Sequence, residues 1–552
     1  MIWHIFKKDF RLRWPYGLAV ATAQFAIVAL HLKLGVFERQ RIFSAVLLVL
    51  EIMMDMGVAV LIATIVQEDS IVGMRQDWLV RPIRRRDLIA AKLLFLLLAV
   101  QVPMLLAALI AGLTNGFPLW LSLSAALSQN AYFLIGFTLP IFAFASLTRS
   151  TSEALGVAFM IGVGSIMGLN VLILPITGSP LGPTSNTGLA WIPLTFRFAI
   201  YFVAALVILA LQYFRRATRT SWLILAASVA ICLFSTLVPW KVVFALQKVI
   251  APAPVTAQGI AVRFDPAHGH FQSAAQASSA RIPPISGAGE RDETNEDAIL
   301  HIPLVFTGVH DGSILKIDRT VARLTMPNST SEQIVSATGD PDDFEVPDDD
   351  QHTSEPRPVD EILHVRGSVY TRLKDAPVTL QLDYSVTLLN LSSTHSIPAV
   401  NGHLSIDGLG HCETRLNDSR TDVDLICLDI GNTSQCTTAL LQDPATGLHN
   451  PPLHDCRDDY APYFGRYQPP DTLVLRGVDF DFRDPSGLIH YPVNEPTVNG
   501  AHVLIKNYNV AGHFTMHLTV PAIRLADWSA QWQTRRQLTM ESDSLHPREK
   551  EQ

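Results

Sequence analysis

The stretch QEDSIVGMRQDWLVRPIRRRDLIAAK, from Gln67 to Lys92, lies between two long apolar runs of a 552-residue chain. It begins with acidic residues and then contains a Gly, a Pro and a basic cluster before the chain becomes apolar again. Basic segments between apolar runs are typical of loops on the cytoplasmic side of a membrane, where Lys and Arg are retained. The stretch therefore predicts a membrane protein and the side on which this loop lies.

Apolar runs fill the first 250 residues. About 20 residues are needed to cross the roughly 30 Å of hydrocarbon, and seven stretches are long enough. They are residues 16–37, 43–66, 88–112, 118–147, 153–175, 198–214 and 221–240, which together form a transmembrane domain over residues 16–240. The first is too long for a signal-peptide core and no small-residue cleavage site follows it, so we expect a permanent helix. Residues 1–15 before it are basic and are expected to lie at the cytoplasmic membrane surface.

Charge divides the chain into two halves. Residues 1–250 carry 20 Lys and Arg against 9 Asp and Glu, whereas residues 251–552 carry 22 against 41. The basic residues of the first half collect in every second loop, which predicts a cytoplasmic N-terminus. Seven crossings then place the acidic half outside, as the periplasmic or extracellular domain of a bacterial inner-membrane protein. We expect membrane lipids, and no nucleic acid, as partners of the basic loops.

The external half is predicted to be mostly β. Residues 251–297 are rich in Pro, Ala, Ser and Gly, and residues 241–297 are expected to form a connector. Apolar and polar residues alternate over 378–388, as in a strand with one buried face and one wet face, and again over 478–482 and 514–520. Less regular strands are expected at 301–309, 314–326, 364–373 and 472–476. The predicted fold is a membrane all-α helical bundle followed by a β-sandwich-like domain over 298–530, either one sandwich or two stacked modules, and a polar tail over 531–552.

Four of the five cysteines lie within 45 residues of the external half. They are Cys412, Cys427, Cys436 and Cys456. In an oxidising compartment they would form two disulfides, although four cysteines allow three pairings. The alternative is four buried thiols.

Motifs for metal binding and catalysis are weak or missing. The segment DPDDFEVPDDD, from Asp340 to Asp350, lacks the Gly and the terminal Glu of an EF-hand loop, so a solvated acidic loop is favoured over a calcium site. In HNPPLHDC, His449, His454 and Cys456 could bind a metal, but an external Cys more often pairs with another Cys. The chain has no HExxH, GxSxG, GxGxxG or GxxxxGK[ST] motif. We expect no metal, no cofactor and no enzyme activity in this chain.

The spacing within the opening stretch carries a family resemblance. An acidic pair precedes a Gly by five and four positions, two apolar residues follow it, and a Pro, a basic residue and a Lys come next. In order, these residues are Glu68, Asp69, Gly73, Trp78, Leu79, Pro82, Arg85 and Lys92. The pattern resembles the loop between the second and third spans in the permease subunits of type-2 ATP-binding-cassette (ABC) exporters. The resemblance covers about residues 1–216, including six spans and the basic N-terminal segment, so the seventh helix and the external domain would be additions.

The resemblance implies a short coupling helix between Gly73 and Pro82 that docks on a separate cytoplasmic ABC ATPase. ATP and Mg would be bound by that ATPase, and a second permease subunit, identical or different, would complete the pathway. Physically, the Pro ends the short helix and the basic run after it favours the anionic inner leaflet. The alternative is a loop that only fixes membrane orientation, which explains Arg84 to Arg86 but not the Gly-to-Pro segment with its acids.

Two carboxylates lie within the second predicted span. Glu51 and Asp55 are four residues apart and therefore share one helix face. Ionisable residues in a membrane are costly and commonly functional, which suggests a translocation path or a subunit interface, with His31 or Lys33 as partners. The alternative is a neutral, hydrogen-bonded pair that fixes helix packing.

Three functions are compatible with this pattern. The first is the permease subunit of a type-2 ABC exporter. The second is a membrane-anchored periplasmic sensor or binding protein whose β-rich domain recognises a ligand or partner. The third is a periplasmic hydrolase attached to a membrane anchor.

Overall fold

The structure, a computed structural model, contains a set of helices and a separate β-rich region. The residues that it describes are 1–33, 41–68, 84–168, 191–235, 238, 240–266, 298–310, 312–326, 332–337, 344–345, 358–406, 409–416, 423–430, 436–442, 453–456, 474–480 and 500–529. Contacts divide the chain into two units. One contains Met1–Gln247 and Leu391–Asn509, and the other contains Lys248–Asn390 and Val510–Gln552.

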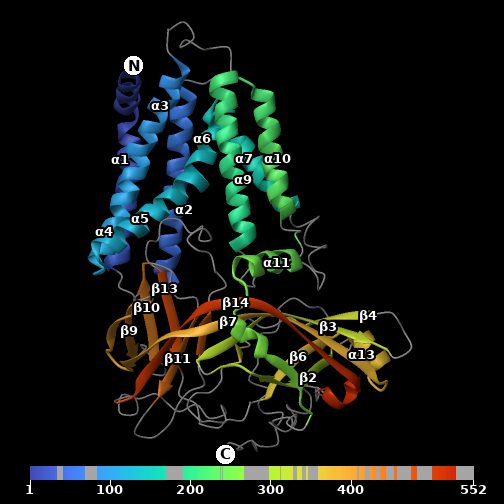
Figure 1. Ribbon diagram of the computed structural model, residues 1–552. Helices are drawn as coiled ribbons and strands as arrows, with labels where there is room; N and C mark the ends of the chain where they lie inside the picture. Colours follow the sequence, from blue (N-terminus) through green and yellow to red (C-terminus); the bar gives the residue numbers. More distant parts are fainter. Residues whose placement is uncertain are drawn as a thin grey trace, which may run out of the picture. The chain divides into compact units, whose positions relative to one another are not determined.

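The helices belong almost entirely to the first unit, where most of them run side by side, whereas α11 lies crosswise (Figure 1). They are α1 (Ile2–Lys33), α2 (Arg41–Glu68), α3 (Arg85–Leu96), α4 (Val102–Thr114), α5 (Leu119–Phe133), α6 (Leu139–Ala145), α7 (Thr151–Gly168), α9 (Trp191–Ala210), α10 (Thr218–Phe234) and α11 (Trp240–Ile250). A π-helical turn joins α3 to α4 and another joins α5 to α6. Pro103 and Pro140 closely follow these turns, so the turns lie where each Pro removes a backbone hydrogen bond.

Four helices are long and apolar enough to cross a membrane among the residues described. They are Val49–Glu68, Arg85–Thr114, Leu119–Ala145 and Thr195–Arg215. Shorter apolar helices cover Thr151–Gly164 and Thr218–Phe234. Large apolar side chains such as Trp120, Phe159 and Met160 remain exposed on the helices, as expected for surfaces that contact lipid. These features indicate a membrane protein.

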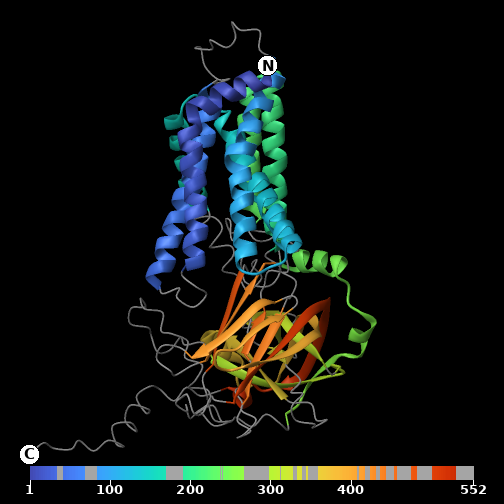
Figure 2. The same ribbon diagram turned by 90° about the vertical axis from the view of Figure 1, so that its left-hand side faces the viewer.

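The first helix does not break at the predicted end of the surface segment. α1 continues from Ile2 to Lys33, with Pro15 inside it. Figure 2 shows that its first turns run across the end of the helices before α1 turns to run along them. A Pro within a helix is a common cause of such a bend.

A first β core lies in the second unit. One sheet has the order β1 (Ala261–Phe264), β2 (Ala298–Thr307) and β6 (Pro358–Val365). It packs against β3 (Ser313–Thr325) and against parts of β7 (Val378–Pro398) and β14 (His502–Ile523). The buried face of the predicted alternation is confirmed, because the six apolar positions of residues 378–388 are all buried in this core. They are Val378, Leu380, Leu382, Tyr384, Val386 and Leu388.

A second β core lies in the first unit. A sheet with the order β13 (Val474–Phe480), β10 (Val423–Asp429), β9 (Gly410–Leu416) and β8 (His403–Ile406) supplies one side. The other side comes from β11 (Cys436–Gln442) and the remaining parts of β7 and β14. The larger sheet has the order β12 (Leu453–Cys456), β11, β14, β7, β3 and β4 (Glu332–Ala337), and β5 (Phe344–Glu345) pairs with β3. The β region therefore has several antiparallel sheets and two hydrophobic cores.

Two predicted segments differ from the structure. The strand expected at 364–373 is wrong over most of its length, because β6 ends at Val365 and a helix, α13 (Gly367–Leu373), follows. Val369 and Leu373 are four residues apart and pack on the first β core from one helix face. The segment expected to be a connector begins with α11 and includes β1, which pairs with β2. The tail 531–552 lies outside the described residues.

One of the two predicted disulfides is present between Cys412 and Cys427, which face each other across β9 and β10. Cys436 is also disulfide-bonded, and Cys456 lies opposite it in the β11–β12 register. Among the described residues, Cys232 is a free, buried thiol.

Peptide mapping under non-reducing conditions is expected to recover the pairs Cys412–Cys427 and Cys436–Cys456. Changing both Cys412 and Cys427 to Ser should lower the free energy of unfolding by roughly 3 kcal/mol, because the unfolded chain regains the conformational freedom of the loop that this disulfide closes, which has a sequence separation of 15. The Cys232→Ser variant is the control and should keep both pairs. Recovery of a Cys412–Cys436 peptide would contradict the register seen here.

Candidate functional site: a charge network at the ends of the predicted coupling segment

Three of the residues assigned by the family resemblance lie in the described structure. Glu68 is the last residue of α2, whereas Arg85 and Lys92 belong to α3. The other five, which lie outside the described residues, are Asp69, Gly73, Trp78, Leu79 and Pro82. The described residues therefore show the contacts made by the helices on either side of the predicted coupling segment.

Lys92 forms a buried ion pair with Asp9 of α1. The Lys92 Nζ lies 3.1 Å from Asp9 Oδ2, and the side chains are only 1% and 0% exposed. Burying two charges is costly unless they pair closely and form further hydrogen bonds. Phe6 and Phe10 of α1 both pack against Phe95 of α3, which supplies apolar contacts between the same two helices.

The same ammonium group also joins the end of α2. Lys92 Nζ donates a hydrogen bond of 2.7 Å to the backbone oxygen of Ile65. Ile65 lies in the last turn of α2, where carbonyl groups lack the partners of the helix interior and the helix dipole favours a cation. One Lys side chain therefore connects α1, α2 and α3.

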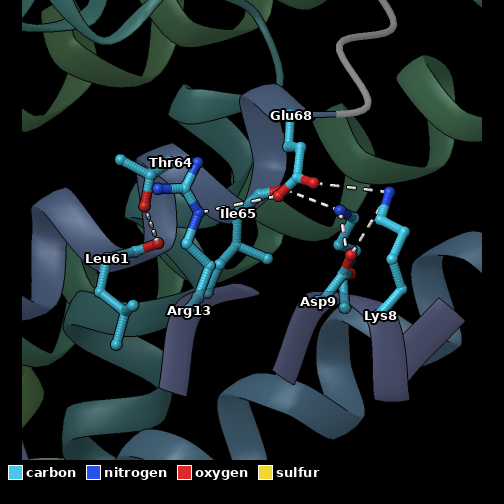
Figure 3. A network of polar contacts seen from close by, with 8 residues as sticks. Lys8, Asp9, Arg13, Leu61, Thr64, Ile65 and Glu68 are labelled. Carbon is cyan, nitrogen blue, oxygen red and sulfur yellow. Dashed lines mark hydrogen bonds and ion pairs between the residues drawn. The ribbon is translucent and has the colours of Figure 1, made fainter. Parts of the chain in front are cut away.

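Glu68 extends the network to two further cations of α1. Its Oε1 lies 3.5 Å from Lys8 Nζ, and its Oε2 lies 3.7 Å from Arg13 Nε (Figure 3). Lys8 also lies 3.7 Å from Asp9 Oδ1, so it is placed between the two carboxylates. We refer to Lys8, Asp9, Arg13, Glu68 and Lys92 as the charge network.

Neighbouring contacts link the same end of the helices to the start of α7 and to the π-helical turn that follows α9, Leu211–Arg215. Gln67 donates through Nε2 to Thr148 Oγ1 at 2.7 Å and accepts from Thr151 Oγ1 at 2.9 Å. Arg85 Nη1 donates to the backbone oxygen of Phe214 at 3.1 Å. Burial and the nearby Arg85 charge lower the pKa of Arg216 from its usual value. Described residues next to three of the basic loops therefore make their contacts at one end of the bundle.

The two carboxylates predicted within the second span are both partly buried. Gln24 of α1 is buried, and its Nε2 lies 4.0 Å from Sδ of Met54, the residue before Asp55. The side chains of His31 and Lys33 lie outside the described set. A translocation or interface role for Glu51 and Asp55 stays a prediction.

A buried hydrogen bond that was not predicted joins the two π-helical turns. Gln101, in the first turn, donates through Nε2 to Thr138 Oγ1 in the second at 2.9 Å. Asn130 of α5 donates to the backbone oxygen of Gln101 at 3.2 Å. Single π-helical turns are often found at functional sites. The signal for these turns in the sequence is the Pro residue that closely follows each of them.

The β region contains a second unpredicted polar cluster, on a face of β7 that was expected to be wet. Thr387 Oγ1 lies 2.6 Å from Asp318 Oδ2 and 2.8 Å from His513 Nδ1, and all three side chains are buried. Since the carboxylate can only accept, Thr387 donates to Asp318 and accepts from the Nδ1–H of His513. Burial, followed by the charge of Lys316, lowers the pKa of His513 to about 4.

A more exposed set lies on the same three strands. Asp383 contacts Arg323 and lies 2.6 Å from Nδ1 of His517. Burial alone would raise the pKa of Asp383, but hydrogen bonds from His517 and Arg323 outweigh it and hold that pKa below its usual value. In the part of the chain that the structure describes, no group of three or more His, Cys, Asp or Glu side chains could hold a metal ion.

Comparison with known proteins adds no relative. No model of a protein family, no curated protein and no solved structure matches this chain.

Proposed function

We propose that the chain is the permease subunit of a type-2 ABC exporter and that a separate cytoplasmic ATPase drives it. The observation that carries this proposal is the charge network, which contains the buried Lys92–Asp9 pair. Glu68 and Lys92, assigned by resemblance on either side of the predicted coupling segment, belong to the same network of α1, α2 and α3.

The arrangement suits a segment that must transmit force. A coupling helix moves the spans only if its two ends are held firmly to them. Here one end is paired with Lys8 and Arg13, and the other is followed by the buried Lys92–Asp9 pair. A loop that only fixes orientation needs exposed cations, and a buried acid–base pair between helices adds nothing to that role.

The remaining architecture follows from this proposal. Residues 1–216 would form the six-span core, and α10 would be an added seventh span that leads to the external domain. The basic end of the bundle would then face the cytoplasm. The Cys412–Cys427 disulfide favours an oxidising compartment for the β-rich region, such as the periplasm. A second permease subunit would complete the pathway, and ATP hydrolysis would occur in the partner ATPase.

Co-purification from native membranes tests the proposal. The full-length chain is expected to retain an ATPase that carries a Walker motif, and Trp78→Ala should reduce the amount retained at least several-fold. Trp120→Ala is the matched control. Trp120 is exposed, but it lies in the first turn of α5, which follows the end of α4 and not the predicted coupling segment. If the wild-type chain retains no ATPase, the membrane-anchored binding protein becomes the better account.

A further inference from the structure

α11 has three distinct faces. Trp240, Val243 and Phe244 are buried and form a cluster with Ile192 and Val238. Trp240 stacks on Phe244 with ring centroids 4.8 Å apart. Since Ile192 belongs to the first turn of α9, this face holds α11 at the end of the bundle where α9 begins (Figure 1).

The second face is apolar and exposed. Val242, Leu246, Val249 and Ile250 are 57%, 47%, 77% and 57% exposed. Their spacing of four, three and one residues places them along one side of the helix. Lys241 and Lys248 are seven residues apart and therefore share a third side, between the buried face and the exposed apolar face.

We propose that α11 is an interfacial helix whose apolar face, Val242, Leu246, Val249 and Ile250, inserts into the lipid surface. Lys241 and Lys248 would then lie among the headgroups. This inference rests on the membrane character of the apolar helices and is independent of the proposed ABC function.

Lipid is favoured as the occupant because of where α11 lies. α10 ends at Phe234 and α11 starts at Trp240, so the connection reaches at most about 20 Å when fully extended. The α11 cluster also includes Ile192, only three positions before the apolar span that starts at Thr195. The helix is thereby held at the level of the membrane boundary, where a short amphipathic helix with Lys on its polar side binds anionic lipid.

An interfacial α11 would have a defined role in the chain. The segment that follows it enters the β region at once, since Pro252 forms a bridge to His513 and β1 starts at Ala261. A helix inserted in the surface would fix the point at which the chain leaves the membrane.

Depth-dependent quenching in vesicles tests the proposal. The full-length Val249→Cys variant is labelled with an environment-sensitive fluorophore and reconstituted in phosphatidylcholine–phosphatidylglycerol vesicles. We expect spin-labelled lipids to quench it at least threefold more strongly than they quench the Lys248→Cys variant. Aqueous iodide should show the opposite order.

Lys248→Cys is the matched control, because it is adjacent in sequence but lies on the polar side. Labelling the wild-type chain in parallel measures the background signal from the buried thiol of Cys232. Equal iodide quenching at both positions would overturn the proposal in favour of a water-exposed face. Protection of Val249→Cys from both quenchers would also overturn it, because a protein partner would then cover this face.

Discussion

The Lys92→Met variant of the full-length chain is expected to lose about 3–5 kcal/mol of unfolding free energy, the usual cost of breaking a buried ion pair from one side. Met retains the length of the side chain but removes the cation 3.1 Å from Asp9. It also removes the donor to the backbone oxygen of Ile65 in the last turn of α2. Denaturant unfolding in detergent micelles, followed by tryptophan fluorescence, measures the loss.

Two further variants separate the buried pair from general charge effects. Lys8→Met removes a cation from the same network, but its side chain is 48% exposed, so a loss of only about 0–1 kcal/mol is expected. Combining Asp9→Asn with Lys92→Met removes both charges and should recover a large part of the stability. Equal losses for Lys8→Met and Lys92→Met, or no recovery in the double variant, would show that the pair does not stabilise the helix ends.

The sequence pointed to two members of this network but not to their main partner. The family resemblance assigns Glu68 and Lys92 but not Asp9. Asp9 is the only acidic residue among the basic first fifteen, and that isolation was the available signal. Its pairing with a residue more than eighty positions later depends on how α1 packs against α3, which spacing along one segment does not contain.

The β region shows a similar limit. Period-two alternation identified β7 and the residues of its apolar face, because that pattern depends only on local strand geometry. It could not reveal that the opposite face is also buried around Thr387. The bulge in β3, between Ile317 and Arg319, brings Asp318 to this position, and such a register shift depends on pairing with β7. Likewise, cysteine spacing allowed three pairings, and the strand register is what places Cys412 opposite Cys427.

Lowering the pH from 7 to 4 is expected to destabilise the β region around His513. The pKa of His513 is about 4 in the folded chain, against 6.5 for an ordinary His. Between these values the unfolded chain binds the proton and the folded chain does not, so stability falls as the pH falls from 6.5 towards 4. The full difference, reached below pH 4, is about 3 kcal/mol. Hydrogen exchange of β7 and β14 peptides in the full-length chain, corrected for intrinsic exchange rates, measures it.

A matched pair of variants assigns this pH dependence to one side chain. His513→Asn keeps a donor towards Thr387 but cannot titrate, so exchange in β7 and β14 should become nearly independent of pH between 4.5 and 7. His517→Asn changes an exposed His on the same strand, whose partner Asp383 has a lowered pKa. A lowered carboxylate pKa contributes stability that is lost only below the ordinary Asp value, about 3.8, so this control should keep the wild-type slope above pH 4.5. An unchanged slope in His513→Asn would mean that the buried His513 is not the group whose protonation opens these strands.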